Sequence, residues 1–116
     1  MKCIHFIFFL SLVLFFTESC SKKKTEDTKF DCTLENYSYN SDIKPIINSR
    51  CSINGCHNSG SPNGDYTTYL GVKTKVDNGS LRERVVTKKD MPSGSPLSAE
   101  DIAKFECWIT SGSKEN

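Results

Sequence analysis

The folded part of this chain has to be small. Of its 116 residues, the first 19 have the features of an export signal and residues 20–36 are mostly polar. A compact domain then extends only over residues 37–112. A domain of roughly 75 residues buries little apolar surface and commonly depends on disulfides, a metal or a cofactor for its stability. The informative residues are therefore the six Cys, two His and two Met.

The N-terminal segment resembles a signal peptide. Lys2 precedes an apolar run from Ile4 to Phe16, which is short for a bilayer core of about 30 Å but suits a signal sequence. Ser19 leads directly into Cys20, so we expect a lipoprotein-type signal over residues 1–19, with Cys20 as the lipidated first residue. The alternative is ordinary cleavage nearby, which releases a soluble protein. Residues 20–36 are expected to form a flexible tether.

Export predicts a location in the cell envelope, either in the periplasm or at the cell surface. Disulfides form in such oxidising compartments. Cys32 precedes the domain and Cys107 lies near its end, so a disulfide between them is the simple expectation. It would close a loop of roughly 75 residues and contribute on the order of 4 kcal/mol. The alternative is a free Cys32 in the tether and a buried, reduced Cys107.

The apolar residues of the domain recur at helical spacing, and no segment alternates as a strand does. We therefore predict an all-α domain of three to five short helices with long loops. The first helix is expected to begin at Ser41 and run into Cys51. Two short helical segments are predicted within residues 66–76 and 81–87. The last helix is expected to start after Ser98, carry a stripe that includes Phe105 and Trp108, and end at Gly112.

The segment from Cys51 to His57 carries the most distinctive chemistry. Covalent haem attachment uses two thiols, which form thioethers with the vinyl groups, and a His directly after the second Cys that binds the iron. Four residues separate Cys51 from Cys56 instead of the usual two, so two of them must bulge outward. Asn54-Gly55 suits such a turn because both residues tolerate positive φ.

Three other roles compete for the same residues. A local disulfide between Cys51 and Cys56 fits the compartment but gives the adjacent His57 no role. Zinc could bind both thiols, His57 and one further Cys, although zinc ligands usually come as two spaced pairs. A thioredoxin-like redox pair needs two intervening residues and a βαβ setting, and the sequence has neither.

A haem iron held by His57 needs a sixth ligand if it is to transfer electrons without binding small molecules. Removal of residues 1–19 leaves no second His and leaves Met91 as the one thioether. Pro92 favours an extended backbone at Met91 and stiffens its loop. We expect Met91 to bind the iron, which raises the reduction potential. The alternatives are a core-filling Met, Lys88 or Lys89 as the ligand, or an open site.

The order of these features resembles that of class I c-type cytochromes: an N-terminal helix, the haem-binding Cys and His, a Met-Pro loop and an aromatic C-terminal helix. The chain is similar over residues 37–112 to the small haem domains of exported bacterial proteins described as planctomycete-type cytochrome c. The segments that carry the similarity are Asp42–Ile47, Gly55–Asn58, Asp90–Pro92 and Cys107–Ile109.

This resemblance implies a cytochrome c-like fold around one haem c. It implies thioethers at Cys51 and Cys56, with His57 as the proximal and Met91 as the distal iron ligand. It also implies that six further side chains lie near the macrocycle: Ile43, Ile47, Tyr69, Leu70, Phe105 and Trp108.

The function predicted from the sequence is electron transfer without catalysis on a substrate. Redox proteins are the expected partners, together with a membrane reached through the lipid anchor. The 15 basic and 14 acidic residues give no reason to expect nucleic acid as a partner. A basic run over residues 73–90 could steer an acidic partner, but such runs are more often solvated faces. The alternatives are a haem-based sensor or small-ligand-binding domain and a non-haem lipoprotein domain stapled by disulfides or zinc.

Overall fold

The computed structural model describes residues 31–116. The predicted signal peptide, Cys20 and most of the predicted tether lie outside the described residues. The described part is helical and contains no strand, which confirms the all-α class. Its elements are η1 (Tyr39–Ile43), α1 (Lys44–Arg50), α2 (Tyr69–Asp77), η2 (Arg82–Thr87) and α3 (Ala99–Thr110). Within this range, no helix combines the length and the hydrophobicity needed to cross a bilayer.

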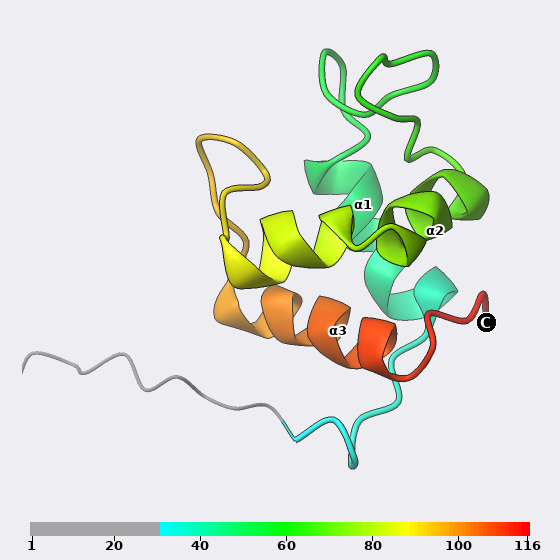
Figure 1. The fold of residues 1–116 in the computed structure, drawn as a ribbon, viewed down its shortest axis with the longest axis vertical. Helices are drawn as coiled ribbons and strands as arrows, with labels where there is room; N and C mark the ends of the chain where they lie inside the picture. Colours follow the sequence, from blue (N-terminus) through cyan, green and yellow to red (C-terminus); the bar gives the residue numbers. More distant parts are fainter. Residues whose placement is uncertain (1–30) are drawn as a thin grey trace, which may run out of the picture.

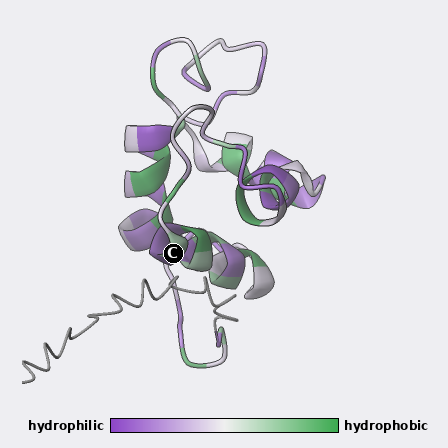
Figure 2. Cartoon of the chain, turned by 90° about the vertical axis from the view of Figure 1, so that its left-hand side faces the viewer, coloured by the Kyte–Doolittle hydropathy of each residue, from purple (hydrophilic) through white to green (hydrophobic). Residues whose placement is uncertain are grey.

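Two of the helical segments pack against α3. Both η2 and η1 contact α3, and η1 continues directly into α1 (Figure 1). Two long loops project from this framework, one over residues 51–66 at the top of the view and one over residues 88–98 at the left (Figure 1). Each helix carries both hydrophobic and hydrophilic residues (Figure 2). Such amphipathic helices bury one face against their neighbours and leave the other in solvent.

The prediction that the first helix begins at Ser41 is wrong, because Ser38 is the residue that caps it. Ser38 has the extended backbone of an N-cap, and its hydroxyl accepts a hydrogen bond from the Ser41 N–H at 3.3 Å. The Asp42 carboxylate accepts in return from the Ser38 N–H at 2.8 Å. This reciprocal pair satisfies two free N–H groups, so the chain turns into a helix three residues earlier than predicted.

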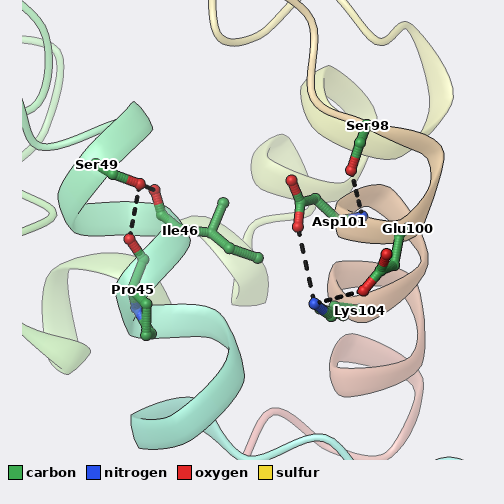
Figure 3. Close-up of polar contacts among 7 residues, drawn as sticks. All are labelled: Pro45, Ile46, Ser49, Ser98, Glu100, Asp101 and Lys104. Carbon is green, nitrogen blue, oxygen red and sulfur yellow. Dashed lines mark hydrogen bonds and ion pairs between the residues drawn. The ribbon is translucent and has the colours of Figure 1, made fainter.

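The last helix is capped at both ends as its sequence predicts. The Ser98 hydroxyl accepts from the Asp101 N–H at 3.0 Å, and in the same turn Lys104 pairs with Glu100 (Figure 3). At the other end, the N–H of Gly112 donates to the Ile109 carbonyl and the N–H of residue 113 donates to the carbonyl of residue 108. This Schellman motif requires the left-handed conformation that Gly112 adopts at φ +101°.

The two middle helices lie close to the predicted segments. The first, α2, begins three residues later than residue 66 because the Thr68 hydroxyl caps it, accepting from the Gly71 N–H. It ends before Gly79, which has φ +77°. In the next segment, Leu81 and Val85 are buried as predicted.

The core is centred on three aromatic side chains, of which Tyr39 and Trp108 are fully buried and Tyr69 is partly buried. The Tyr39 ring packs against the Trp108 ring, with 5.6 Å between the ring centroids. The rings of Tyr39 and Tyr69 meet edge to face, with 5.0 Å between their centroids. The indole N–H of Trp108 donates to the Lys114 carbonyl, and the Tyr69 hydroxyl donates to the Ser113 carbonyl. Packing therefore continues beyond residue 112, because the chain after α3 supplies acceptors for buried donors.

A disulfide joins the N-terminal side of the domain to α3. Cys32 and Cys107 form a disulfide with their Cα atoms 5.0 Å apart and 75 positions between them in the sequence. A cross-link over so long a loop restricts the unfolded chain and stabilises the fold by about 4 kcal/mol on the chain-entropy account. This is the staple that a core of this size calls for.

The exposed side chain of Ser49 forms hydrogen bonds to the backbone of its own short helix, α1. Its hydroxyl donates to the carbonyl of Pro45 at 2.8 Å and to that of Ile46 at 3.3 Å (Figure 3). Such bonds from a serine hydroxyl to the carbonyls three and four residues earlier add a side-chain donor within the helix. The helix ends at Arg50, and Cys51 is its C-cap.

Candidate functional site

A cavity of about 410 Å³ lies among α1, the loop after it, η2, the Met91 loop and α3. This is within the usual range of small-molecule and cofactor sites. Four of the residues singled out by sequence line it: Cys51, Cys56, His57 and Met91. Met91 lies 34 positions after His57, so the fold brings together residues that are distant in the chain.

The residues between the two thiols form a tight turn. The Cys56 N–H donates to the Ile53 carbonyl at 3.0 Å, and Gly55 has φ +81°, the conformation expected for the two-residue bulge. The His57 N–H then donates to the Cys51 carbonyl, also at 3.0 Å. Because this bond closes the loop, both thiols and the imidazole are held at one side of the cavity despite the four intervening residues.

Two contacts orient the imidazole of His57. Its Nδ1 lies 3.3 Å from the Gly64 carbonyl oxygen, which can only accept, so this hydrogen bond requires the proton on Nδ1. In that tautomer Nε2 has a free lone pair, the arrangement found in metal-binding histidines. The Tyr66 ring stacks on the imidazole, and the Tyr66 N–H donates to the His57 carbonyl at 2.9 Å.

Cys51 and Cys56 are both thiols and are not joined to each other. Cys51 is buried, and burial raises the pKa of its thiol to about 11. Cys56 is partly exposed. The local disulfide considered from the sequence is thus not formed, and both sulfur atoms are available for bonds to a ligand in the cavity.

Met91 faces the cavity from the opposite loop. It is partly buried and packs against the core, so it contributes to the apolar wall as well. The alternative ligands Lys88 and Lys89 are exposed and lie outside the cavity lining. Of the three candidates for a sixth ligand, Met91 is therefore the one that the fold directs to the site.

The cavity wall is apolar with a positively charged margin. Buried side chains of Ile47, Leu81, Val85 and Phe105 form much of it. Three cations also line it, Arg50, Lys75 and Arg84, and none of its lining residues is an Asp or Glu. Such a wall favours a largely apolar ligand that carries negative charge.

The cations differ in how they are paired. Arg50 donates to the carbonyl and hydroxyl oxygens of Ser95 at 2.8 and 3.0 Å, which are neutral acceptors, and it forms no ion pair within residues 31–116. Arg84 forms an ion pair with Asp90 at 2.7 Å, and this pair holds the pKa of the Asp90 carboxyl below its usual range.

The six side chains that the resemblance places near a macrocycle are not all at the cavity. Ile47 and Phe105 line it, whereas the other four do not. Leu70 is 73% exposed, because it lies two positions from the buried Val72 and so points from the opposite side of α2. Its predicted place at the site is wrong.

Sequence reasoning did not assign Tyr66, Arg50 or Lys75 to the site. The sequence pattern predicts a helix over residues 66–76, whereas Tyr66 lies in the loop that returns to His57. Arg50 could have been found from the sequence, because it directly precedes Cys51 at the end of the predicted first helix and so must lie near the predicted site. Lys75 comes from α2, and only the fold shows that α2 borders the cavity.

The zinc alternative gains no geometric support. Among residues 31–116, no three His, Cys, Asp or Glu side chains are arranged to hold a metal ion. A haem iron needs no such cluster, because the porphyrin supplies four of its ligands.

Comparisons with known proteins gave no match, whether with profiles of protein families, with characterised proteins or with solved structures. The residues of the cavity are therefore the basis on which a function can be assigned.

Proposed function

We propose that this chain is an electron-transfer protein that carries one covalently bound haem c in a cytochrome c-like, all-α domain. One observation carries the proposal. Cys51, Cys56, His57 and Met91, the residues that haem attachment and axial ligation require, line the same cavity although they come from two separate loops. We propose no enzymatic activity.

The residues present fit this cofactor in three respects. The wall is apolar, as the porphyrin ring requires, and the margin is cationic, as its two carboxylates require. The two thiols are unbonded and lie in one closed loop with the imidazole. The Gly64 carbonyl accepts from Nδ1 of His57 and so leaves Nε2 for the iron.

Each residue then has a specific part. Cys51 and Cys56 would attach the ring, His57 and Met91 would bind the iron, and Arg50 and Lys75 would face the carboxylates. When bound, the haem supplies a reversible one-electron change between ferrous and ferric iron. Met91 would take the position at which a small molecule could otherwise bind, and its thioether would raise the reduction potential.

The proposed setting is the cell envelope. A lipid on Cys20 would anchor the chain to a membrane, and residues 20–36 would tether the domain within reach of redox partner proteins. Neither Cys20 nor most of that tether belongs to the described residues. The disulfide between Cys32 and Cys107 supports an oxidising compartment, because such bonds are rare in the cytosol.

The decisive experiment is haem retention after denaturation. The chain would be expressed with its signal in a host that has a c-type cytochrome maturation system, then denatured and extracted with acidic solvent. We expect haem to stay with the polypeptide and to give a pyridine haemochrome spectrum of two thioethers. The Cys51→Ser and Cys56→Ser variants should each shift that spectrum to the one-thioether form.

A chain that carries no haem after maturation overturns the proposal. The control is the Cys32→Ser/Cys107→Ser double variant, which removes the disulfide outside the cavity and leaves no new thiol. The haem attached to this variant should give the same haemochrome spectrum as wild type.

A further inference from the structure

Arg84 holds the Met91 loop by both its backbone and its side chain. The Arg84 carbonyl accepts from the Asp90 N–H at 3.0 Å and from the Met91 N–H at 3.3 Å. The Arg84 Nε donates to the Asp90 Oδ1 at 2.7 Å. Three polar contacts thus converge on the two residues that direct the Met91 side chain to the cavity.

The backbone between Arg84 and Asp90 reverses its direction, so that Asp90 and Met91 come back to Arg84. The η2 helix ends with the Lys88 N–H donating to the Glu83 carbonyl, and Lys89 then adopts φ +55°. A left-handed residue directly after a helix reverses the chain direction. Residues 90 and 91 are therefore folded back along η2, and Arg84, which itself lines the cavity, is the residue they meet.

We propose that Arg84 and Asp90 form a latch that keeps Met91 at the cavity and so controls how readily another ligand replaces it. Both are positioning residues, because both would act on the iron only through Met91. This inference rests on the proposed function, since it concerns the ligand that Met91 would provide. The latch sets the fraction of molecules in which the Met91 loop is open and the sixth position is free.

The latch is suited to local control because it contributes little to global stability. The side chains of Arg84 and Asp90 are 45% and 43% exposed, and exposed ion pairs are worth little to the folded state. Its release should therefore open one loop and leave the aromatic core intact. Local openings of this kind occur well below the free energy of global unfolding.

The first test uses the holoprotein and a ligand that competes with Met91. Imidazole binding to the ferric form and carbon monoxide binding to the ferrous form would be measured for wild type, Asp90→Asn and Arg84→Leu. We expect each variant to bind imidazole about threefold to tenfold more tightly, since one charge-assisted contact is lost. The double variant should add little to either single variant, because both changes break the same contact.

Arg82→Leu is the matched control. Arg82 lies on the same helix and forms an ion pair with Glu106 of α3, away from the Met91 loop. It should leave imidazole affinity within twofold of wild type. Equal affinities in wild type and the latch variants, or an equal gain in Arg82→Leu, would overturn the latch.

A second measurement needs no haem and separates this inference from the proposed function. Hydrogen exchange at the amides of Asp90 and Met91 should be faster in Arg84→Leu and Asp90→Asn than in wild type, with no change in Arg82→Leu. Unchanged exchange overturns the latch even if haem is attached. Faster exchange supports the latch even if the chain carries no haem, in which case the proposed function fails alone.

Discussion

The phenol ring of Tyr66 lies parallel to the imidazole of His57, with 4.0 Å between the ring centroids and 5° between the planes. Backbone bonds reinforce the contact, since Tyr66 N–H donates to the His57 carbonyl. The imidazole is thus fixed in position and in plane by the loop that follows it, without help from any bound group.

This stack predicts different effects for two substitutions of Tyr66. Tyr66→Phe keeps the ring and should change the free energy of unfolding by less than about 1 kcal/mol. Tyr66→Ala removes a partly buried ring and should cost about 2 kcal/mol. Urea unfolding checks both values. A Tyr66→Ala variant as stable as Tyr66→Phe would show that the ring does not support the loop.

Gly71 carries a second prediction for the same loop. A Cβ at this position would lie 1.7 Å from the Asp65 carbonyl oxygen, which is backbone and adjoins Tyr66. Gly71→Ala should therefore destabilise the fold by about 2 kcal/mol or more, although Ala favours a helix by up to about 1 kcal/mol. Thermal unfolding measures the difference.

The control for Gly71→Ala lies beside it on α2. Leu70 is 73% exposed, so Leu70→Ala should change stability by less than about 0.5 kcal/mol. If Gly71→Ala is equally harmless, α2 and the loop do not approach each other as described.

Replacement of Met91 tests the sixth ligand. Met91→Ala should lower the reduction potential by on the order of 0.1 V or more, a part of the range of about 0.8 V that axial ligands span. It should also allow carbon monoxide to bind the ferrous protein rapidly. Redox titration and carbon monoxide difference spectra measure the two effects.

Lys88→Ala and Lys89→Ala are the matched controls, because both lysines are exposed and outside the cavity lining. They should leave the potential and the spectrum unchanged. A Met91→Ala protein with the wild-type ferric spectrum would assign the sixth position to another residue.

The buried thiol of Cys51 predicts a pH dependence in protein prepared without haem. Its pKa is raised to about 11 because burial disfavours the thiolate, which is the form that alkylates. In the Cys56→Ser variant, alkylation of Cys51 by iodoacetamide should rise about tenfold per pH unit up to about pH 11. Peptide mapping of the quenched samples measures the rate at this one site.

The same shift has a consequence for stability. The folded state holds the Cys51 proton more tightly than the unfolded chain, whose thiol has the ordinary pKa of 9.0. This contribution is complete below about pH 9 and is lost as the pH rises towards 11. Cys51→Ser should remove that part of the pH dependence. Equal alkylation rates for Cys51 in folded and in urea-unfolded protein would contradict the burial.

Local signals predicted the parts of the fold that are decided locally. The Ser98 cap and the Gly112 stop of α3 depend on residues within one turn, and both are present. The first helix has two serines that could cap it: Ser41, which directly precedes Asp42, and Ser38, which lies four positions before Asp42. Ser38 is the cap because its N–H donates to the Asp42 carboxylate. The spacing of residues in the sequence does not reveal this bond.

The sequence predicted the reactive residues of the candidate site, but not the residues that orient and surround them. Cys51, Cys56, His57 and Met91 carry side chains that can bond to haem or to its iron, so their chemistry identifies them. No motif in the sequence singles out Tyr66, Lys75 and Arg84, which acquire roles through the packing of different elements around one cavity. The prediction for Leu70 is wrong for a related reason. The hydrophobic periodicity of α2 is weak and does not indicate which face of the helix is buried.

The disulfide between Cys32 and Cys107 also determines how mechanical load would pass through the domain. A pull on the chain before Cys32 is transmitted through the sulfur atoms into α3, and residues 33–50 bear none of it directly. Residues 51–57, with both thiols and the imidazole, lie off this path. A force applied from the N-terminal side would thus reach the cavity first through α3, which supplies Phe105 to its wall, and not through the segment of the two thiols.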